Sequence, residues 1–295
     1  MNAGLQLARE AGKPGTAAGA LSSLAFGAYR DGNFAEIRPL GTEALALARA
    51  AGDPLEEARA LNTLGSASLN EHDLGLARSY HEQGLALARG AGHRLVAAAI
   101  LTNLGEVSRA QGDLQSATRY YEEAMAEQLK LGNRWATLTP LFNLGEVAAA
   151  QNDPTEAARY FQEGLTLAQE LGVGFGSFEG GLGYVAAGAG DVTSARRFFA
   201  QTLSRGRAIG DLPLVLYALV GFARLRALAG EPIGAAEWLG LAQSHPSAET
   251  DVRGRANALL IDLRVVLSAE ELDAALARGA KLDLDAVVQD IMRKV

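Results

Sequence analysis

Two stretches of the chain are near-copies, and their spacing constrains the fold more than any other feature of the sequence. Residues 101–132 and 141–172 both begin with Leu-x-Asn-Leu-Gly-Glu-Val, continue with Asp-x-x-x-Ala-x-Arg-Tyr and end with Leu-Gly, at an offset of 40 residues. A fixed period of this length is typical of repeat architectures. In such folds each unit buries its apolar face only by stacking on its neighbours.

The repeat continues beyond the two copies and has the pattern of helix pairs. Apolar residues such as Leu101, Leu104 and Val107 are spaced three residues apart, which indicates helices. A small residue recurs in each first helix: Ala25, Gly65, Gly105, Gly145, Gly183 and Ala223. A glycine follows most second helices, where a left-handed backbone is needed: Gly52, Gly92, Gly132, Gly172 and Gly210. We therefore expect six helix pairs, with helices of about 15–18 residues.

Aromatic side chains and irregular positions give further expectations. We expect the large residues of the second helices to fill the space between pairs: Tyr80, Tyr120, Tyr160, Phe198 and Trp238. Pro39 and Pro140 should each kink a helix, because proline removes an intrahelical hydrogen bond. The fifth pair opens with several glycines between Gly172 and Gly183, so its first helix should be short, irregular or mobile.

The two ends of the chain depart from the period. Residues 4–12 match residues 84–92, which predicts that residues 1–12 are the second helix of a truncated repeat and that the chain is a fragment of a longer protein. A natural capping helix is the alternative. Residues 13–245 hold the six pairs. Residues 246–295 should form capping helices at roughly 249–266, 269–279 and 284–294, the second with a Ser268–Glu271 capping box.

The composition of the chain limits the kinds of partner and compartment that we expect. The formal net charge of −7 argues against direct nucleic-acid binding, which needs a basic surface. The chain has no cysteine, and no apolar run is long enough to span a membrane. The first residues lack the apolar core of a signal peptide, so we expect a cytoplasmic protein. We expect no cofactor, and the oligomeric state stays open.

Catalytic and metal-binding patterns are weak. The four histidines, His72, His81, His93 and His245, lack ligand spacing and are expected to be solvated surface residues. Residues 181–186 fit Gly-x-Gly-x-x-Ala, but they lie on the repeat's packing glycine rather than after a strand. We therefore predict no catalytic residues and no metal site.

The marks Leu101, Leu104-Gly105, Ala117 and Tyr120 resemble those of the tetratricopeptide repeat over about residues 1–243. The 40-residue period is similar to the long-helix subtype of kinesin light chains, Leu-Gly-Asn scaffold proteins and bacterial regulators. HEAT repeats have a similar period but lack these marks. The resemblance implies an all-α, right-handed superhelical solenoid of antiparallel helix pairs with a C-terminal helical cap.

The tail adds a second resemblance. Residues 234–240, 272–279 and 282–288 resemble the end of the sensor region of bacterial LuxR-type signal-transduction ATPases. This implies a covalently linked nucleotide-binding domain in a longer parent protein. Residues 1–295 contain no phosphate-binding loop and no evident helix-turn-helix domain.

The tetratricopeptide resemblance also implies a concave groove lined by the first helices. We number the positions of each first helix so that its recurring small residue, such as Gly105, is at place 8. Places 2, 5, 9 and 12 then lie on one face of the helix. The candidate binding residues there are Arg59, Asn62, Ser66, Thr102, Glu106, Arg109, Phe142, Glu146, Tyr184, Tyr217 and Arg224. Phe26 and Tyr29 add aromatic rings from the first pair. Glu106 and Arg109 could instead merely pair with each other on a solvated helix.

The carboxylate clamp of chaperone-tail binders needs Lys and Asn at places five and nine, where the third pair has Thr102 and Glu106, so that ligand is disfavoured. We therefore expect a non-enzymatic module that binds a protein or peptide, as the sensor of a bacterial transcriptional regulator. A free-standing scaffold or a peptide-pheromone receptor is the alternative. An enzyme with its active site in the groove is a weaker one.

Overall fold

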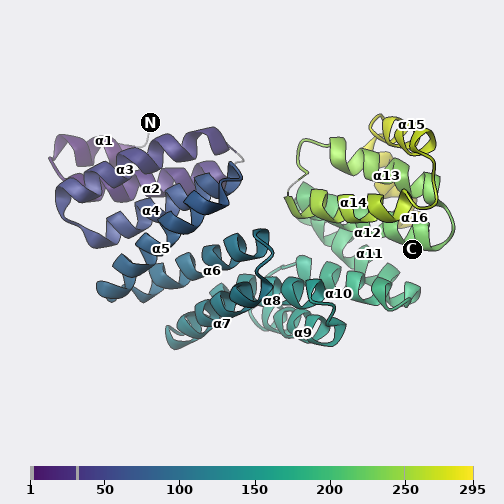
Figure 1. The fold of residues 1–295 in the computed structure, drawn as a ribbon, viewed down its shortest axis with the longest axis horizontal. Helices are drawn as coiled ribbons and strands as arrows, with labels where there is room; N and C mark the ends of the chain where they lie inside the picture. Colours follow the sequence, from purple (N-terminus) through teal and green to yellow (C-terminus); the bar gives the residue numbers. More distant parts are fainter. Residues whose placement is uncertain (1–2, 31–32, 249, 295) are drawn as a thin grey trace. The chain divides into compact units, whose positions relative to one another are not determined.

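The computed structural model describes residues 3–30, 33–248 and 250–294. Across these residues the regular structure consists of sixteen α-helices and two short 3-10 turns, with no strand (Figure 1). The prediction of an all-α array of helix pairs is confirmed. Three helices of the repeat pairs have only 12 or 13 residues, fewer than the expected 15–18: α8, α10 and α13.

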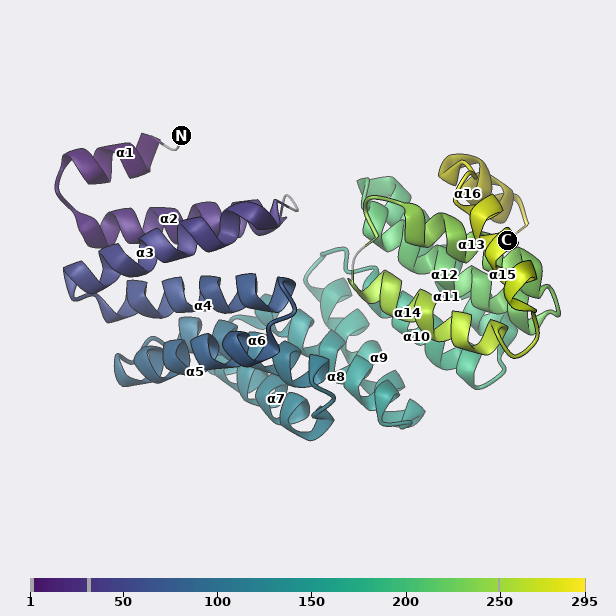
Figure 2. The ribbon, with the colours of Figure 1, turned by 45° about the horizontal axis from the view of Figure 1, so that its top comes forward.

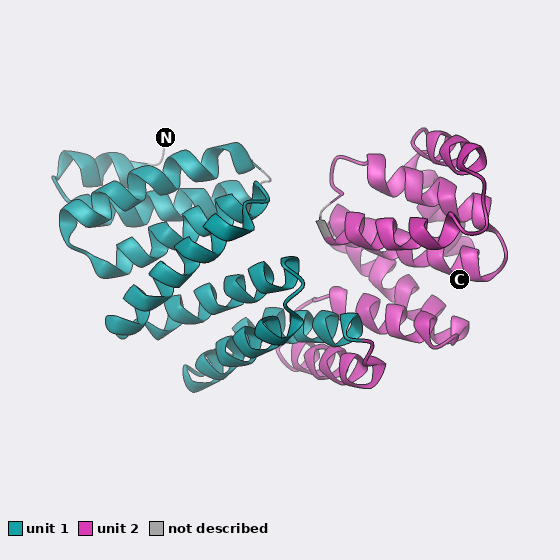
Figure 3. Cartoon of the chain, viewed as in Figure 1, with its two compact units in different colours: residues 1–151 teal, residues 152–295 magenta. Residues whose placement is uncertain are grey.

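The chain divides into two compact units at Gln151 (Figure 3). Unit 1 contains α1 (Ala3–Glu10), α2 (Pro14–Arg30), α3 (Ile37–Ala51), α4 (Pro54–Asn70), α5 (Leu74–Gly90), α6 (Arg94–Ala110), α7 (Leu114–Lys130) and α8 (Leu138–Ala150). Helices that follow one another pack together as α2/α3, α4/α5 and α6/α7, and the first helices α2 and α4 also touch. The result is a stack of helix pairs within the unit (Figure 2).

Unit 2 contains α9 (Pro154–Glu170), α10 (Ser177–Gly188), α11 (Val192–Ile209), α12 (Leu212–Leu228), α13 (Pro232–Ser244), α14 (Thr250–Leu263), α15 (Ala269–Gly279) and α16 (Leu284–Arg293). The pairs α10/α11 and α12/α13 repeat the packing of unit 1. The three last helices lie close to the expected positions. The domain boundaries at residues 12 and 245 stay predictions.

The helix ends follow the sequence signals. Asp53 caps the N-terminus of α4, and its carboxylate accepts hydrogen bonds from the amides of Leu55 and Glu56. Gly52, which ends the preceding helix, has a φ of 64°, a conformation that glycine adopts without a Cβ clash. Ser268 and Glu271 form the predicted capping box. These local signals set the 40-residue register in three dimensions.

The prolines do not interrupt helices as expected. Pro39 and Pro140 are each the third residue of an α-helix, α3 and α8. The amide at that position has no intrahelical acceptor, so proline removes no bond from the α-helix there. Each α-helix is preceded by a 3-10 turn, at Phe34–Glu36 and Arg134–Thr137. The expectation of an internal kink is wrong, because these α-helices begin later than the repeat period predicts.

The aromatic residues that fill the helix interfaces lie one position later than expected. Tyr121 is fully buried, and a Cβ added to Gly105 would lie 2.4 Å from its ring. Phe199 and Gly183 make the same contact. The expected set (Tyr80, Tyr120, Tyr160, Phe198 and Trp238) is half-buried instead. Each buried ring follows a buried alanine of the same helix by four residues, as Tyr121 follows Ala117, and residues four apart lie on the same helix face.

His81 occupies this ring position in the second pair. Its burial shows that the expectation of a solvated surface histidine is wrong. Its side chain is fully buried against Gly65, and neither ring nitrogen has a hydrogen-bond partner in the structure. Burial lowers its pKa from 6.5 to about 4, because a buried imidazole loses the hydration of its charged form. His72 is exposed, and His93 and His245 are half-buried.

Helix α10 explains the glycines of the fifth pair. It is short, as expected, but it is a regular α-helix of 12 residues. A Cβ at Gly180 would lie 2.4 Å from Tyr217, and one at Gly181 would lie 2.8 Å from Phe161. These glycines therefore make room for aromatic rings of the neighbouring helices.

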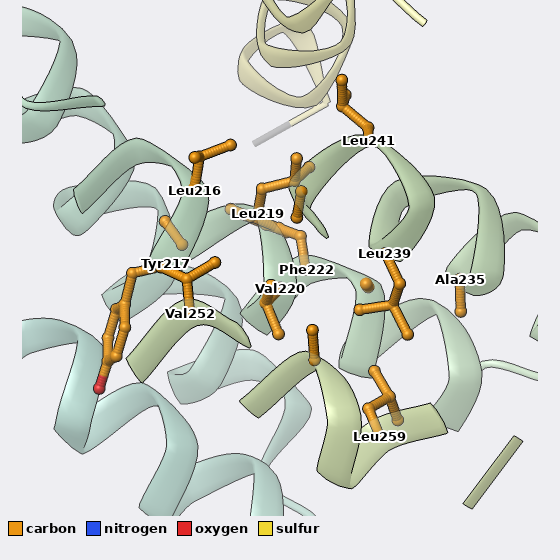
Figure 4. Close-up of a cluster of buried hydrophobic side chains, with 14 of the residues drawn as sticks. Leu216, Tyr217, Leu219, Val220, Phe222, Ala235, Leu239, Leu241, Val252 and Leu259 are labelled. Carbon is orange, nitrogen blue, oxygen red and sulfur yellow. The ribbon is translucent and has the colours of Figure 1, made fainter. Parts of the chain in front are cut away.

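The C-terminal helices complete the core of unit 2. Val252 and Leu259 of α14 are buried and point toward Val220 and Leu239 of the preceding pair (Figure 4). Helix α15 packs on α13. A Cβ at Gly279 would lie 1.8 Å from the carbonyl oxygen of Glu237, so the α13 and α15 backbones touch.

Candidate functional site

The candidate residues of unit 1 form one surface. We call it the first-helix face: the side chains at places 2, 5, 9 and 12 of α2, α4, α6 and α8. The neighbouring places on these helices, such as Leu101, Leu104 and Val107 of α6, are fully buried. Arg59, Ala99 and Thr139, at place 2, are exposed. The other candidate residues of unit 1 are half-exposed: Asn62, Ser66, Thr102, Glu106, Arg109, Phe142 and Glu146.

Glu106 contacts polar side chains on two helices. Its carboxylate forms an ion pair with Arg109 one turn later on α6, at 3.0 Å. It also accepts a hydrogen bond of 2.6 Å from the side-chain amide of Asn143 on α8. The pairing along one helix that the sequence suggests is therefore present, but Glu106 also links two first helices. An exposed ion pair of this kind contributes at most about 1 kcal/mol.

A second side-chain bond crosses from α6 to α4. The amide of Asn103 donates to the side-chain oxygen of Asn62 at 2.9 Å. Asn103 and Asn143 occupy the same place in successive repeats, and both reach back to the preceding first helix. These two amides therefore hold polar groups of neighbouring helices in fixed positions on the first-helix face.

Sequence reasoning did not select these two asparagines as site residues. The signal was present, because the near-copies share Leu-x-Asn-Leu-Gly with Asn103 and Asn143 in the same place. Their place adjoins the selected face, and Asn143 is 7% exposed. They position the neighbouring groups that do reach solvent.

Arg59 is the α4 residue at place 2 of the face. It pairs with Glu56 at 2.8 Å, and Glu56 is only 8% exposed. The Glu56 carboxylate lies close to Gly19 of α2. Burial raises the pKa of Glu56, and the charge of Arg59 partly opposes that rise.

The α2 end of the face is aromatic. Phe26 is 64% exposed and Tyr29 is 49% exposed. The ring of Tyr29 packs edge-on against Phe34 at a centroid distance of 5.8 Å. The face thus passes from aromatic side chains on α2, through polar groups on α4, to carboxylates on α6 and α8.

The candidate residues of unit 2 lie against helix α14. Tyr217 of α12 is only 6% exposed. The guanidinium of Arg255, from α14, lies over the rings of Tyr184 and Tyr217. Arg224 pairs with Asp262 of α14 at 4.0 Å. The prediction is wrong for Tyr217, because α14 covers it, and the repeat pattern gives no sign of that cover. Tyr184 and Arg224 are half-exposed, like the candidates of unit 1, and their place in a groove stays a prediction.

The described residues show no grouping of three or more acidic or histidine side chains suited to a metal ion. None of the helices in the described ranges has both the length and the apolar character needed to cross a membrane. The chemistry of the first-helix face consists of amides, carboxylates, guanidinium groups and aromatic rings. These groups recognise a ligand through hydrogen bonds, charge and apolar contact.

Comparison with known proteins agrees with this architecture. Residues 96–170 match the sequence model of the tetratricopeptide repeat. This segment spans α6 to α9 and includes both near-copies. A search of curated proteins finds no match.

Several solved structures share the fold. BtubC (BKLC) from P. vanneervenii superposes with a TM-score of 0.61 and 21% identity, covering 70% of this chain and 89% of that one. A Rap protein complexed with competence and sporulation factor gives a TM-score of 0.67 at 13% identity, covering 96% of this chain and 76% of that one. A Podospora anserina protein with TPR-like repeats gives 0.50 at 17% identity, covering 65% and 93%. At these identities the likeness establishes a tetratricopeptide-like helical-repeat fold.

Proposed function

We propose that the first-helix face of unit 1 binds an extended segment of a protein or peptide. The observation that carries this proposal is the pair of side-chain bonds, Asn103 to Asn62 and Asn143 to Glu106, that fix polar groups across successive helices. Groups that are already oriented lose less conformational entropy on binding, so they favour a ligand that runs across several repeats.

The chemistry of the face suggests the character of the ligand. Glu106 and Glu146 supply carboxylates, which favour a segment with basic side chains. The exposed rings of Phe26 and Tyr29 favour apolar side chains at the other end. The proposed role is recognition without catalysis.

We further propose that the chain is the sensor part of a bacterial transcriptional regulator ATPase and acts in the cytoplasm. Support comes from the tail. The segments 234–240 and 272–279, which carry the resemblance, pack on each other, with Gly240 against Leu276 and Gly279 against Glu237. Arg278 adds an ion pair with Glu237 at 2.8 Å. Such close backbone contact explains why both segments need glycine.

A peptide receptor without an attached ATPase is the second candidate. The likeness to the Rap protein over 96% of this chain favours it, because that structure holds the competence and sporulation factor. The two candidates differ in the parent gene. A phosphate-binding loop upstream in the same reading frame would support the ATPase sensor. A ribosome-binding site directly upstream of the Met1 codon would support the receptor without an ATPase.

The binding face is tested by charge reversal. Peptides from a random display library are selected on the immobilised chain, and the affinity of a selected peptide is measured by calorimetry. For Glu106→Lys with Glu146→Lys we expect an affinity loss of about 10-fold or more, because two carboxylates are replaced by cations. Circular dichroism melting should show that the double variant stays folded.

The matched control is Glu82→Lys with Glu122→Lys. Both residues are on second helices of the same unit and are exposed, and the change in net charge is the same. We expect unchanged affinity for this variant. Equal weakening by both double variants would mean that the net charge, and not the first-helix face, determines binding. Unchanged affinity in the Glu106–Glu146 variant would refute the assignment.

A further inference from the structure

Helix α14 packs on the last helix pair of unit 2. It contacts both α12 and α13. Its apolar side chains, spaced three to four residues apart, are buried in the core of unit 2: Val252, Ala256, Leu259, Leu260 and Leu263. In Figure 4, Val252 lies beside Tyr217. The helix is therefore held in place by its apolar side and brings its polar residues to the edges of that contact.

One of these polar residues, Arg255, lies among aromatic rings. Its guanidinium carbon is 3.8 Å from the centre of the Tyr184 ring and 4.9 Å from that of Tyr217. The two rings meet edge to face at 5.2 Å. The Tyr184 hydroxyl donates a 3.0 Å hydrogen bond to the carbonyl of Tyr217, which fixes the ring orientation. A cation over such ring faces is attracted by their negative potential.

The same places are open in unit 1. Tyr217 is at place 2 of α12, and the equivalent residues Arg59, Ala99 and Thr139 are exposed. Tyr184 is at place 9 of α10, equivalent to Glu106 of α6. Tyr184 and Tyr217 thus occupy, in unit 2, places that belong to the first-helix face in unit 1, and Arg255 of α14 lies over their rings.

We propose that Tyr184 and Tyr217 form a binding site for a guanidinium group, and that Arg255 of the same chain is its internal occupant. The ligand class is an arginine side chain presented by a helix. The site is distinct from the proposed peptide-binding face, because its residues belong to α10 and α12 of unit 2.

The contribution of the cation is tested in the full chain with Arg255→Met, which keeps an apolar stem and removes the charge. We expect the melting temperature to fall by about 2–8 °C, with a change in the near-ultraviolet circular dichroism of the tyrosines. Arg255→Lys keeps a cation without the planar fork and should melt between the two. The matched control is Arg264→Met, an exposed residue in the turn directly after the same helix, for which we expect no shift.

Selectivity is tested by chemical rescue of Arg255→Ala with N-ethylguanidinium at low, non-denaturing concentration. We expect a saturable recovery of the melting temperature and of the tyrosine signal, with ethylammonium less effective and Arg264→Ala unresponsive. If Arg255→Ala does not fold, the proposal is tested by the order of the melting temperatures of the Arg255→Met and Arg255→Lys variants. The proposal is overturned if Arg255→Met melts like the unmodified chain, or if a folded Arg255→Ala shows no saturable response. Neither readout involves peptide binding by unit 1.

Discussion

His81 shows how one residue can differ from its repeat while keeping the packing. In the equivalent positions, Tyr121, Phe161 and Phe199 are buried aromatic rings. His81 fills the same space against Gly65, yet its ring nitrogens lack hydrogen-bond partners. A buried polar ring without partners reduces stability relative to an apolar ring of similar size.

This position makes the stability of the chain sensitive to acid. The folded-state pKa of His81 is about 4 and the unfolded value is 6.5, so the unfolded state binds the proton more readily. Stability is therefore lost as the pH falls from about 6.5 toward 4, by up to about 1.4 kcal/mol per pH unit. We predict that His81→Phe removes this part of the pH dependence in urea denaturation.

The matched control is His72→Asn, at an exposed turn with a φ of 62° that Asn152 also adopts. We expect its pH profile to follow that of the unmodified chain. A profile for His81→Phe that still falls as steeply between pH 6.5 and 4 would contradict the burial of a neutral imidazole.

The helix pairs depend on glycines that admit a ring from the partner helix. Gly105 on α6 and Tyr121 on α7 are 16 residues apart, and Gly65 with His81 and Gly183 with Phe199 have the same separation. Each of these glycines faces a ring of its own repeat. The distance between the helix axes in a pair is therefore set by the absence of a single Cβ.

We predict that Gly105→Ala destabilises unit 1 by about 1–3 kcal/mol in urea denaturation, because the new Cβ overlaps the buried ring of Tyr121. Gly105→Leu should be worse. The control is Gly27→Ala, also inside a first helix, where a Cβ would meet nothing within 4 Å. It should be neutral or stabilising by up to about 1 kcal/mol. Equal effects of the two alanine variants would disprove the ring contact.

The elements could be predicted from the sequence because their signals are local. Capping aspartates, closing glycines and the 40-residue period place the helices to within a few residues. Two adjacent aromatic residues, Tyr120 and Tyr121, cannot be distinguished by type, and only the structure shows that the second is buried. Contacts between distant segments leave no periodic signal, so the cover of Tyr217 by Arg255 could not be predicted. The partners of Glu106 on other helices could not be predicted either.

At the scale of the whole molecule, the chain consists of two compact units, each with its own buried residues. The core of unit 2 includes the last helices, from α14 to α16. In repeat arrays each element is stabilised mainly by its neighbours, so a local loss of packing has local effects.

We predict that Leu259→Ala, which removes a buried side chain of α14, destabilises unit 2 by about 2–5 kcal/mol. Hydrogen exchange followed by mass spectrometry should show faster exchange in α12 to α16 and unchanged exchange in α4 to α6. The control is Ile261→Ala, a 63% exposed residue of the same helix, which should change neither. Faster exchange throughout unit 1 in Leu259→Ala would show that the chain unfolds as a single cooperative unit.

The contact between a glycine and a ring inside the second, third and fifth pairs has an evolutionary consequence. Because both partners lie within one 40-residue segment, as with Gly105 and Tyr121, duplication or deletion of a whole segment carries the matched contact with it. A recombination breakpoint at a closing glycine such as Gly92 or Gly132 would preserve every such match. A breakpoint between the two helices could join a glycine to a foreign side chain. Tandem gain and loss of whole segments is thus a route by which such a chain can change length while these contacts inside the pairs are kept.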